Sequence, residues 1–167
     1  MKSSTPGLMI RAYAAGADEA WATELLRNGL GGRLQARRGE LVDVLDGDGL
    51  IAELDGRTVG LLTFRAEGPA TIELAALVVI EPGRGAGSAL VAAFLDEARL
   101  RGAARVWVVT TNDNLDALRL YQRRGFRLVA LRAGAVDRAR ADLKPSIGWV
   151  ADNGIPIRDE LELAIDL

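Results

Sequence analysis

Three glycines and an arginine stand together just before a run of residues with helical spacing. The segment Glu81–Ala103 reads EPGRGAGSALVAAFLDEARLRGA, with Gly83, Arg84, Gly85 and Gly87 near its start. The backbone N–H groups of such a turn, continued by the free N–H groups and positive dipole end of a helix, form an anion site. Gly85 and Gly87 let the main chain approach a pyrophosphate, and Arg84 can add charge-assisted hydrogen bonds. The alternative is a tight strand-to-helix turn without a ligand.

The spacing of the glycines excludes two common phosphate-binding loops. A P-loop requires G-x-x-x-x-G-K-[ST], and no lysine lies near these glycines. A dinucleotide fingerprint requires G-x-G-x-x-G/A, but counting from Gly83 places Ser88 at the last position and counting from Gly85 places Leu90 there. The segment therefore fits neither loop.

The chain contains no cysteine and no histidine among its 167 residues. Disulfides, Cys/His zinc sites, cysteine nucleophiles and Ser-His triads are therefore excluded. Chemistry must use carboxylates, Tyr, Lys, Arg, Ser, backbone groups, or a cofactor that carries its own reactive atom. We expect no metal site, and we expect the late acids Asp159 and Glu160 to face solvent.

Composition and charge are those of a globular protein, with 49% hydrophobic and 26% charged residues. The length suits a single domain over residues 1–167. A net charge of −2, with arginines interleaved among acids, makes nucleic acid an unfavoured partner. Apolar runs are only strand-length, and the opening residues lack the apolar core of a signal peptide, so we expect a cytoplasmic protein without a membrane partner.

The glycine-rich loop lies between a buried strand and an amphipathic helix. TIELAALVVI, Thr71–Ile80, is nearly continuously apolar and predicts a strand covered on both faces. A helix is predicted over Gly87–Arg101, and ARVWVVTT, Ala104–Thr111, predicts a second buried strand containing Trp107 as a core residue. Together these elements predict a βαβ crossover with parallel strands and an α/β fold.

The other elements surround this crossover. Residues 31–48 are interpreted as a mobile connection with one short strand, in which Arg37 and Arg38 are solvated or residues 31–43 line an acceptor pocket. The tract 144–160, KPSIGWVADNGIPIRDE, is interpreted as a loop rich in Pro, Gly and Asn, in which Trp149 is either a core residue or a stacking platform. Further predicted elements are strands at 8–12, 126–133 and 160–166, helices at 18–28, 115–124 (capped from Asn112–Asn114) and 136–144, and a hairpin of 50–54 with 58–65 around Asp55-Gly56.

Two segments resemble, in the same order, the signatures of the GNAT family of N-acetyltransferases. RGAGSA, Arg84–Ala89, matches the acyl-CoA signature [QR]-x-x-G-x-[GA]. NLDALRLYQRRGF, Asn114–Phe126, resembles N-x-x-A-x-x-x-Y-x-x-x-G-F. The resemblance covers roughly residues 50–131, and it departs from the family where proline stands at Pro82 instead of the preceding position. It implies a mixed central sheet of about six or seven strands, with a splayed parallel pair and helices on both faces.

The resemblance also implies that acetyl-CoA is the co-substrate. The pantetheine arm would lie between the strands at 71–80 and 104–111, with its thioester carbonyl on a backbone N–H near Leu77 in an oxyanion-hole type of contact. Val78 and Val79 would offer further main-chain partners, and Asn114 and Ala117 would contact the cofactor near the start of their helix. The residues implied to hold the pyrophosphate are Arg84, Gly85, Ala86, Gly87, Ser88 and Ala89.

Two residues are candidates for proton transfer. The resemblance places Tyr121 where the family has the acid that protonates the leaving thiolate, and the alternative is core packing on the helix face. Glu73 is the candidate base, because it is an ionisable residue within an apolar strand and lies eleven residues before Arg84, as in histone-type family members. A salt bridge at Glu73 and a water relay are the alternatives.

The expected function is transfer of an acetyl group from acetyl-CoA to a primary amine. Without a cysteine to carry the acetyl group, direct attack in a ternary complex is the economical route. A non-catalytic acyl-CoA-binding or regulatory domain is the alternative. The acceptor is a small-molecule or peptide amine that the sequence does not identify, and the resemblance makes a homodimer plausible.

Overall fold

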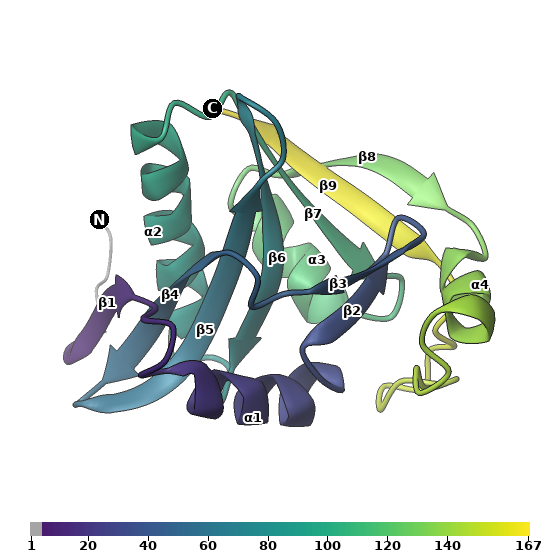
Figure 1. The fold of residues 1–167 in the computed structure, drawn as a ribbon, viewed down its shortest axis with the longest axis horizontal. Helices are drawn as coiled ribbons and strands as arrows, with labels where there is room; N and C mark the ends of the chain where they lie inside the picture. The colour runs from purple at the N-terminus through teal and green to yellow at the C-terminus, as the bar shows by residue number, and fades with distance from the viewer. Residues whose placement is uncertain (1–4) are drawn as a thin grey trace.

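A mixed sheet of seven strands forms the centre of the molecule (Figure 1). The computed structural model describes residues 5–167, and the first four residues, part of the opening segment expected to lack a signal peptide, lie outside it. The helices are α1 (Glu19–Leu30), α2 (Ala86–Leu100), α3 (Leu115–Arg123) and α4 (Ala135–Asp142). The strands are β1 (Leu8–Ala12), β2 (Leu34–Arg37), β3 (Glu40–Asp43), β4 (Asp48–Leu54), β5 (Arg57–Ala66), β6 (Thr71–Val79), β7 (Arg105–Thr111), β8 (Arg127–Arg132) and β9 (Glu160–Asp166).

Within the sheet, only β6 and β7 run parallel to each other. The order is β1-β4-β5-β6-β7-β9-β8, and β2 and β3 form a separate two-stranded sheet. The parallel pairing stops after four residue pairs, the last being Leu74 with Val108. At that point Ala75 has no partner in β5, since Thr63 faces Ala76 and the adjacent Phe64 faces Leu74. An extra residue in one strand of an antiparallel pair forms a β-bulge. Strand β6 has such a bulge at Ala75, and beyond it β6 separates from β7.

Helices cover both faces of the sheet. One cluster of buried residues joins α2 and α3 to the sheet and includes Phe94 and Leu90, both fully buried. A second cluster joins α1 to the other face through Leu26 and Ile51. Burying one such large apolar side chain contributes about 1.5–3 kcal/mol, so these two clusters fix the helices against the sheet. The mixed α/β architecture with helices on both faces is the one expected from the sequence.

Both short hairpins turn through residues with left-handed backbone. Asp55 and Gly56 have φ of 50° and 76°, which confirms the predicted hairpin of β4 with β5. The interpretation of residues 31–48 as a connection with one short strand is wrong, because β2 and β3 form a hairpin there. Its turn residues Arg38 and Gly39 have φ of 51° and 78°, and Arg-Gly is not among the dipeptides that predict such a turn.

The tract between β8 and β9 folds around the guanidinium of Arg140. This side chain is 5% exposed and donates hydrogen bonds to the carbonyl oxygens of Ile147, Gly148 and Ile157 at 2.8–3.1 Å. Trp149 stacks over the same guanidinium, with 4.0 Å between Cζ and the ring centroid. A buried cation thus satisfies the carbonyl groups of a loop that has little secondary structure of its own.

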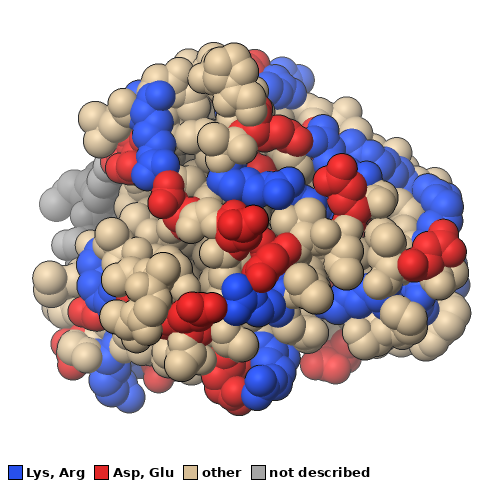
Figure 2. Space-filling view, in the orientation of Figure 1, with Lys and Arg blue, Asp and Glu red and all other residues tan. Residues whose placement is uncertain are grey.

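Acidic and basic side chains lie close to one another on one face of the molecule (Figure 2). The face in Figure 2 shows both signs interspersed, without a continuous basic area. Such a mixed surface offers little attraction to a polyanion. Within residues 5–167, no helix combines the length and the hydropathy needed to cross a bilayer.

Candidate functional site

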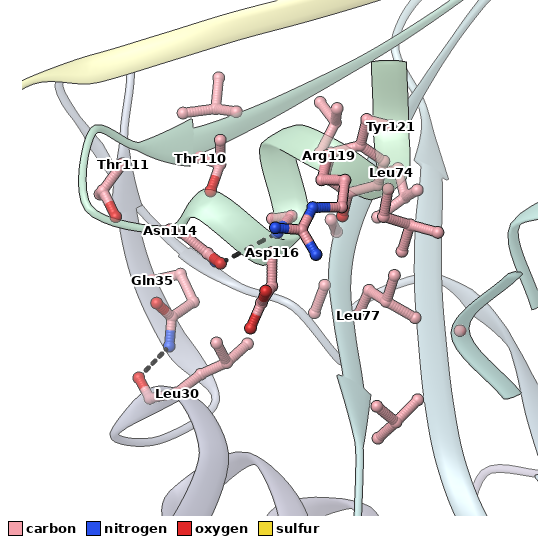
Figure 3. A pocket seen from close by; sticks show the side chains of 18 of the residues that line it. Leu30, Gln35, Leu74, Leu77, Thr110, Thr111, Asn114, Asp116, Arg119 and Tyr121 are labelled. Atoms are coloured by element: carbon pink, nitrogen blue, oxygen red, sulfur yellow. Dashed lines mark hydrogen bonds between the residues drawn. The ribbon is translucent and has the colours of Figure 1, made fainter. Parts of the chain in front are cut away.

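A cavity of about 840 Å³ opens where β6 and β7 separate. Figure 3 shows Leu74 and Leu77 of β6 on one side, and Thr110 and Thr111 of β7 on another. Side chains of α3 and the glycine-rich loop before α2 complete the wall, and β2 closes one end. The cavity therefore extends from the gap between β6 and β7 to the start of α2.

The glycine-rich loop presents the start of α2 to this cavity. Gly83 and Gly85 have φ of 87° and 82°, a conformation that favours glycine. No side chain within the described residues caps the helix, so its first N–H groups are free for a ligand. Gly85, Gly87 and Ser88 line the cavity, whereas Ala86 is buried in the core.

Arg84 and Ala89, also predicted to bind the pyrophosphate, do not line the cavity. The Arg84 side chain is 57% exposed, and its Nη1 lies 3.6 Å from a carboxylate oxygen of Glu81. The backbone carbonyl of Arg84 accepts a hydrogen bond from the Thr5 hydroxyl at 3.2 Å. The arginine is thus placed at the outer rim, where it can reach a phosphate only by turning its flexible side chain inward.

Main-chain groups of β6 face the gap on alternate residues. The N–H of Ile80 donates to the carbonyl of Val59 in the strand before it, at 2.8 Å. Because main-chain groups alternate in direction along a strand, those of Val78 also face β5, and those of Leu77 and Val79 face the gap. Leu77 and Val79 line the cavity and Val78 does not. Two of the three residues predicted to make main-chain contacts with the cofactor therefore face the gap, and the contacts themselves stay a prediction.

Helix α3 brings three predicted residues to the cavity. Asn114 caps the helix by accepting a hydrogen bond from Ala117 N at 3.1 Å, as Figure 3 shows, and both residues line the cavity. Tyr121 also lines the cavity, is 4% exposed, and packs against the ring of Phe126 at 5.5 Å. No group in residues 5–167 forms a hydrogen bond with its hydroxyl. Burial raises the pKa of Tyr121 well above its ordinary value, so the hydroxyl stays protonated.

Glu73 lies outside the cavity, in an ion cluster beneath it. Its side chain is 1% exposed, and both carboxylate oxygens accept hydrogen bonds from Nε and Nη2 of Arg37. Arg65 Nε donates to the same carboxylate at 2.6 Å. The expected apolar surroundings were wrong, because two arginines from β2 and β5 surround the carboxylate. Glu73 therefore forms a salt bridge, as the alternative interpretation stated. The interpretation of Arg37 as a solvated charge was wrong, because its side chain is buried.

Charged residues of β9 also lie at the end of the cavity that β2 closes. Glu160 is 3% exposed, lines the cavity, and accepts hydrogen bonds from Arg38 N at 3.0 and 3.2 Å. Asp159 accepts a hydrogen bond from Gly134 N at 2.8 Å. Glu160 is buried, so the expectation that it faces solvent was wrong, whereas Asp159, which directly precedes β9, is half-buried. The alternation of acidic and apolar residues in ELELAID was the available signal, since it places the acids on one face of the strand.

The hairpin of β2 and β3 is fixed beside these acids by polar contacts. Gln35 Nε2 donates to the carbonyls of Leu30 and Gly32 at 2.9 and 2.7 Å. Arg38 stacks over the ring of Trp107 at 4.0 Å, and Trp107 itself is buried as predicted. Of residues 31–43, Gln35, Ala36 and Arg37 line the cavity, and an acceptor pocket at this position stays a prediction. No group of three or more His, Cys, Asp or Glu residues within 5–167 could hold a metal ion.

Sequence comparison identifies the family. The model of the "Acetyltransferase (GNAT) family" matches residues 14–126. Two uncharacterized proteins of Bacillus subtilis (strain 168) are similar to the chain. YxbD is 42% identical over 125 residues, which cover 75% of this chain and 77% of YxbD. YdhI is 38% identical over 119 residues, which cover 71% of this chain and 72% of YdhI. The chain belongs to the GNAT acetyltransferase family.

Solved structures confirm the fold. An IAA acetyltransferase from Bacillus cereus ATCC 14579 is 25% identical, with a TM-score of 0.77 over 96% of this chain and 99% of that one. A Bacillus subtilis acetyltransferase in complex with CoA has the same values of identity, TM-score and coverage. A GNAT acetyltransferase from Elizabethkingia anophelis with acetyl-CoA bound is 21% identical, with a TM-score of 0.78 over 97% and 99% of the chains.

Proposed function

We propose that the protein transfers an acetyl group from acetyl-CoA to a primary amine by direct attack in a ternary complex. One observation carries the proposal: a single cavity joins the gap between β6 and β7 to the uncapped start of α2. An extended chain with a pyrophosphate at one end suits this shape, because strand edges bind amides and helix starts bind phosphates.

In this proposal the protein main chain holds the cofactor. The N–H groups around Gly85, Gly87 and Ser88 bind the pyrophosphate, and Arg84 turns in from the rim. The main-chain groups of Leu77 and Val79 pair with the pantetheine amides and the thioester carbonyl. These roles are the predicted ones, with one difference. Ala86, Ala89 and Val78 do not line the cavity, and we assign them no direct contact with the cofactor. Asn114 and Ala117 line the wall opposite, on α3.

Tyr121 is proposed to stabilise the leaving group. As the amine nitrogen forms its bond to the acetyl carbon, the carbon–sulfur bond breaks and the sulfur leaves with a negative charge. The Tyr121 hydroxyl, which stays protonated and has no partner within residues 5–167, donates a hydrogen bond to this sulfur, and the thiolate then takes up a proton from water, which receives the proton that the amine loses. A buried donor acts more strongly on such a charge than one in water.

The amine must lose a proton, and Glu73 is poorly placed to accept it. Both of its oxygens are engaged by arginines, and it does not line the cavity. We therefore favour the water relay over Glu73 as base, with the carboxylate serving to hold Arg37 in position.

The decisive experiment measures release of free CoA thiol from acetyl-CoA with a panel of amines, with mass spectrometry of the acetylated product. Turnover that depends on the amine supports acetyl transfer. Tight acetyl-CoA binding without turnover, for every amine offered, would instead support the alternative of a non-catalytic acyl-CoA-binding domain. The substitution Arg84→Glu tests the rim arginine, and unchanged acetyl-CoA affinity would exclude a phosphate contact by that side chain.

A further inference from the structure

We infer that the acceptor is a small amine with a carboxylate next to its amino group, as in an α-amino acid, and that Arg37 and Glu160 bind its two charged ends. This inference rests on the proposed acetyl transfer. It concerns the end of the cavity formed by β2 and β9.

Arg37 has an unused donor at this end of the cavity. The side chain is 6% exposed and lines the cavity, and its Nε and Nη2 are bound to Glu73. Among residues 5–167, no acceptor is bound to its third nitrogen, Nη1. Because a guanidinium is planar and its donors have fixed directions, the pairing with Glu73 orients Nη1 for a further acceptor. A carboxylate oxygen is the acceptor that suits a buried guanidinium.

The Glu73 carboxylate is shared by two guanidinium groups, those of Arg37 and Arg65. Arg65 is 30% exposed and keeps contact with solvent, whereas Arg37 is buried and depends on protein or ligand groups for its remaining hydrogen bonds. A buried donor without an acceptor is costly, and a carboxylate bound at Nη1 removes that cost.

Glu160 supplies the opposite charge close by. Its carboxylate is 3% exposed, lines the cavity, and is held by the main-chain N–H of Arg38, the residue directly after Arg37. The cationic group in contact with it, Arg132 Nη1, is at 3.4 Å. Lone pairs of Glu160 thus remain for an ammonium group. An anion site and a cation site on adjacent elements match a molecule that carries both charges.

Calorimetric titration of the protein–CoA complex tests this inference without requiring catalysis. The ligands are the common protein amino acids, each compared with its own carboxamide, which lacks only the negative charge. For the amino acid that binds best, we expect at least about tenfold higher affinity than for its carboxamide, as one charge-assisted hydrogen bond predicts. Equal or tighter binding of the carboxamides, or no binding of any amino acid, overturns the inference.

Two arginine variants distinguish a direct contact between Arg37 and the ligand from an indirect effect of the Glu73 ion cluster. Arg37→Lys keeps the charge but loses the fixed donor, and we expect the preference for the carboxylate to fall to less than about threefold. Arg65→Lys alters the same Glu73 cluster from a position that does not line the cavity, and the preference should remain. Melting temperature and acetyl-CoA affinity verify that both variants are folded. An equal loss in both variants would contradict a direct role of Arg37.

Glu160→Gln tests the other charge, since glutamine retains an oxygen for Arg38 N. We expect weaker binding of the amino acid but unchanged binding of its N-acetyl derivative, which has no ammonium group. Equal weakening of both ligands would refute the ammonium contact. Thiol release on the same panel is scored separately: specific binding of amino acids without turnover would contradict the proposed acetyl transfer and leave the binding inference standing.

Discussion

At the scale of single residues, two glycines of the same loop have different physical roles. Gly85 has φ of 82°, which is strained for any residue with a Cβ, so its first role is to shape the turn. Gly87 lies in the first turn of α2, and an added Cβ would meet the Leu120 side chain at 3.5 Å, an ordinary contact. Nothing in the protein fold therefore requires glycine at position 87, whereas a closely approaching pyrophosphate would.

This difference gives a prediction for two alanine variants. Gly87→Ala should weaken acetyl-CoA binding by about tenfold or more without lowering the free energy of unfolding, because alanine is the better helix former. Gly85→Ala should lower the free energy of unfolding by about 1 kcal/mol, because its backbone is strained. Calorimetry and urea denaturation measure the two quantities. Unchanged acetyl-CoA affinity in Gly87→Ala would show that the cofactor does not approach this residue.

Tyr121→Phe removes only the hydroxyl from a buried ring. We expect kcat to fall by about 100-fold, the lower end of what a proton donor contributes, while the affinity for acetyl-CoA changes little. Steady-state kinetics and calorimetric titration measure the two effects. A variant with the turnover of the original protein would assign Tyr121 to core packing alone.

The raised pKa of Tyr121 also predicts a pH dependence of stability. The folded pKa lies above the unfolded value of about 10, so the stabilising contribution is complete below that pH. It is lost as the pH rises through the folded pKa, because only the unfolded chain ionises readily. Urea denaturation between neutral and strongly alkaline pH should show a shallower loss of stability in Tyr121→Phe. Parallel curves for the two proteins would contradict this assignment.

The sequence predicted residues that line the cavity better than it predicted the surroundings of the charged residues. Gly85, Gly87, Ser88, Asn114, Ala117 and Tyr121 line the cavity because local motifs place them at helix starts and on a helix face. Glu73, Arg37 and Glu160 were misjudged because their surroundings come from strands distant in the chain. The apolar neighbours of Glu73 in its own strand suggest an unpaired, desolvated carboxylate. Its partners Arg37 and Arg65 lie on two other strands, β2 and β5.

At the scale of elements, α4 and its following loop depend on Arg140. Arg140→Met keeps much of the side-chain volume but removes the donors to three loop carbonyls. We expect the free energy of unfolding to fall by about 2 kcal/mol, as for hydrogen bonds that involve a buried charge. Arg138→Met, at an exposed position of the same helix, is the matched control and should change stability by less than about 0.5 kcal/mol. If urea denaturation shows an equal loss of the free energy of unfolding in both variants, the hydrogen bonds of Arg140 to the loop do not stabilise the fold as we expect.

Element types were predictable where periodicity was strong. The predicted strand at 160–166 coincides with β9, and the predicted boundaries of α2 and α3 differ from the observed ones by at most one residue. The β2–β3 hairpin was missed because its strands are four residues long and its Arg-Gly turn gives no local signal. Its stability comes from contacts with the rest of the molecule, such as the pairing of Arg37 with Glu73.

At the scale of the whole molecule, ligand binding should raise stability. If acetyl-CoA binds only the folded chain, a concentration 100 times its Kd adds about 2.7 kcal/mol. For a protein of this size that raises the melting temperature by about 5 to 10 °C. Differential scanning calorimetry with acetyl-CoA, and with an equal concentration of ATP as a control for the phosphates, measures the shift. A shift of the same size with ATP would mean that the gap in the sheet is not occupied by the pantetheine arm.

The strand order could be predicted only in part. The crossover from β6 through α2 to β7 follows from local pattern and the handedness of such units. The insertion of β9 between β7 and β8 does not, because it depends on pairing between Arg105 and Asp166, far apart in the chain. The early end of the β6–β7 pairing likewise depends on a register shift at Ala75 that has no sequence signature.

The place of β9 has a consequence for the order in which the chain folds. Its seven residues bridge β7 and β8, yet they leave the ribosome after both of those partners. Until they emerge, a nascent chain holds two strands with open edges and an unfinished sheet. The side of the cavity that Glu160 forms is therefore assembled only after both β7 and β8 have been synthesised.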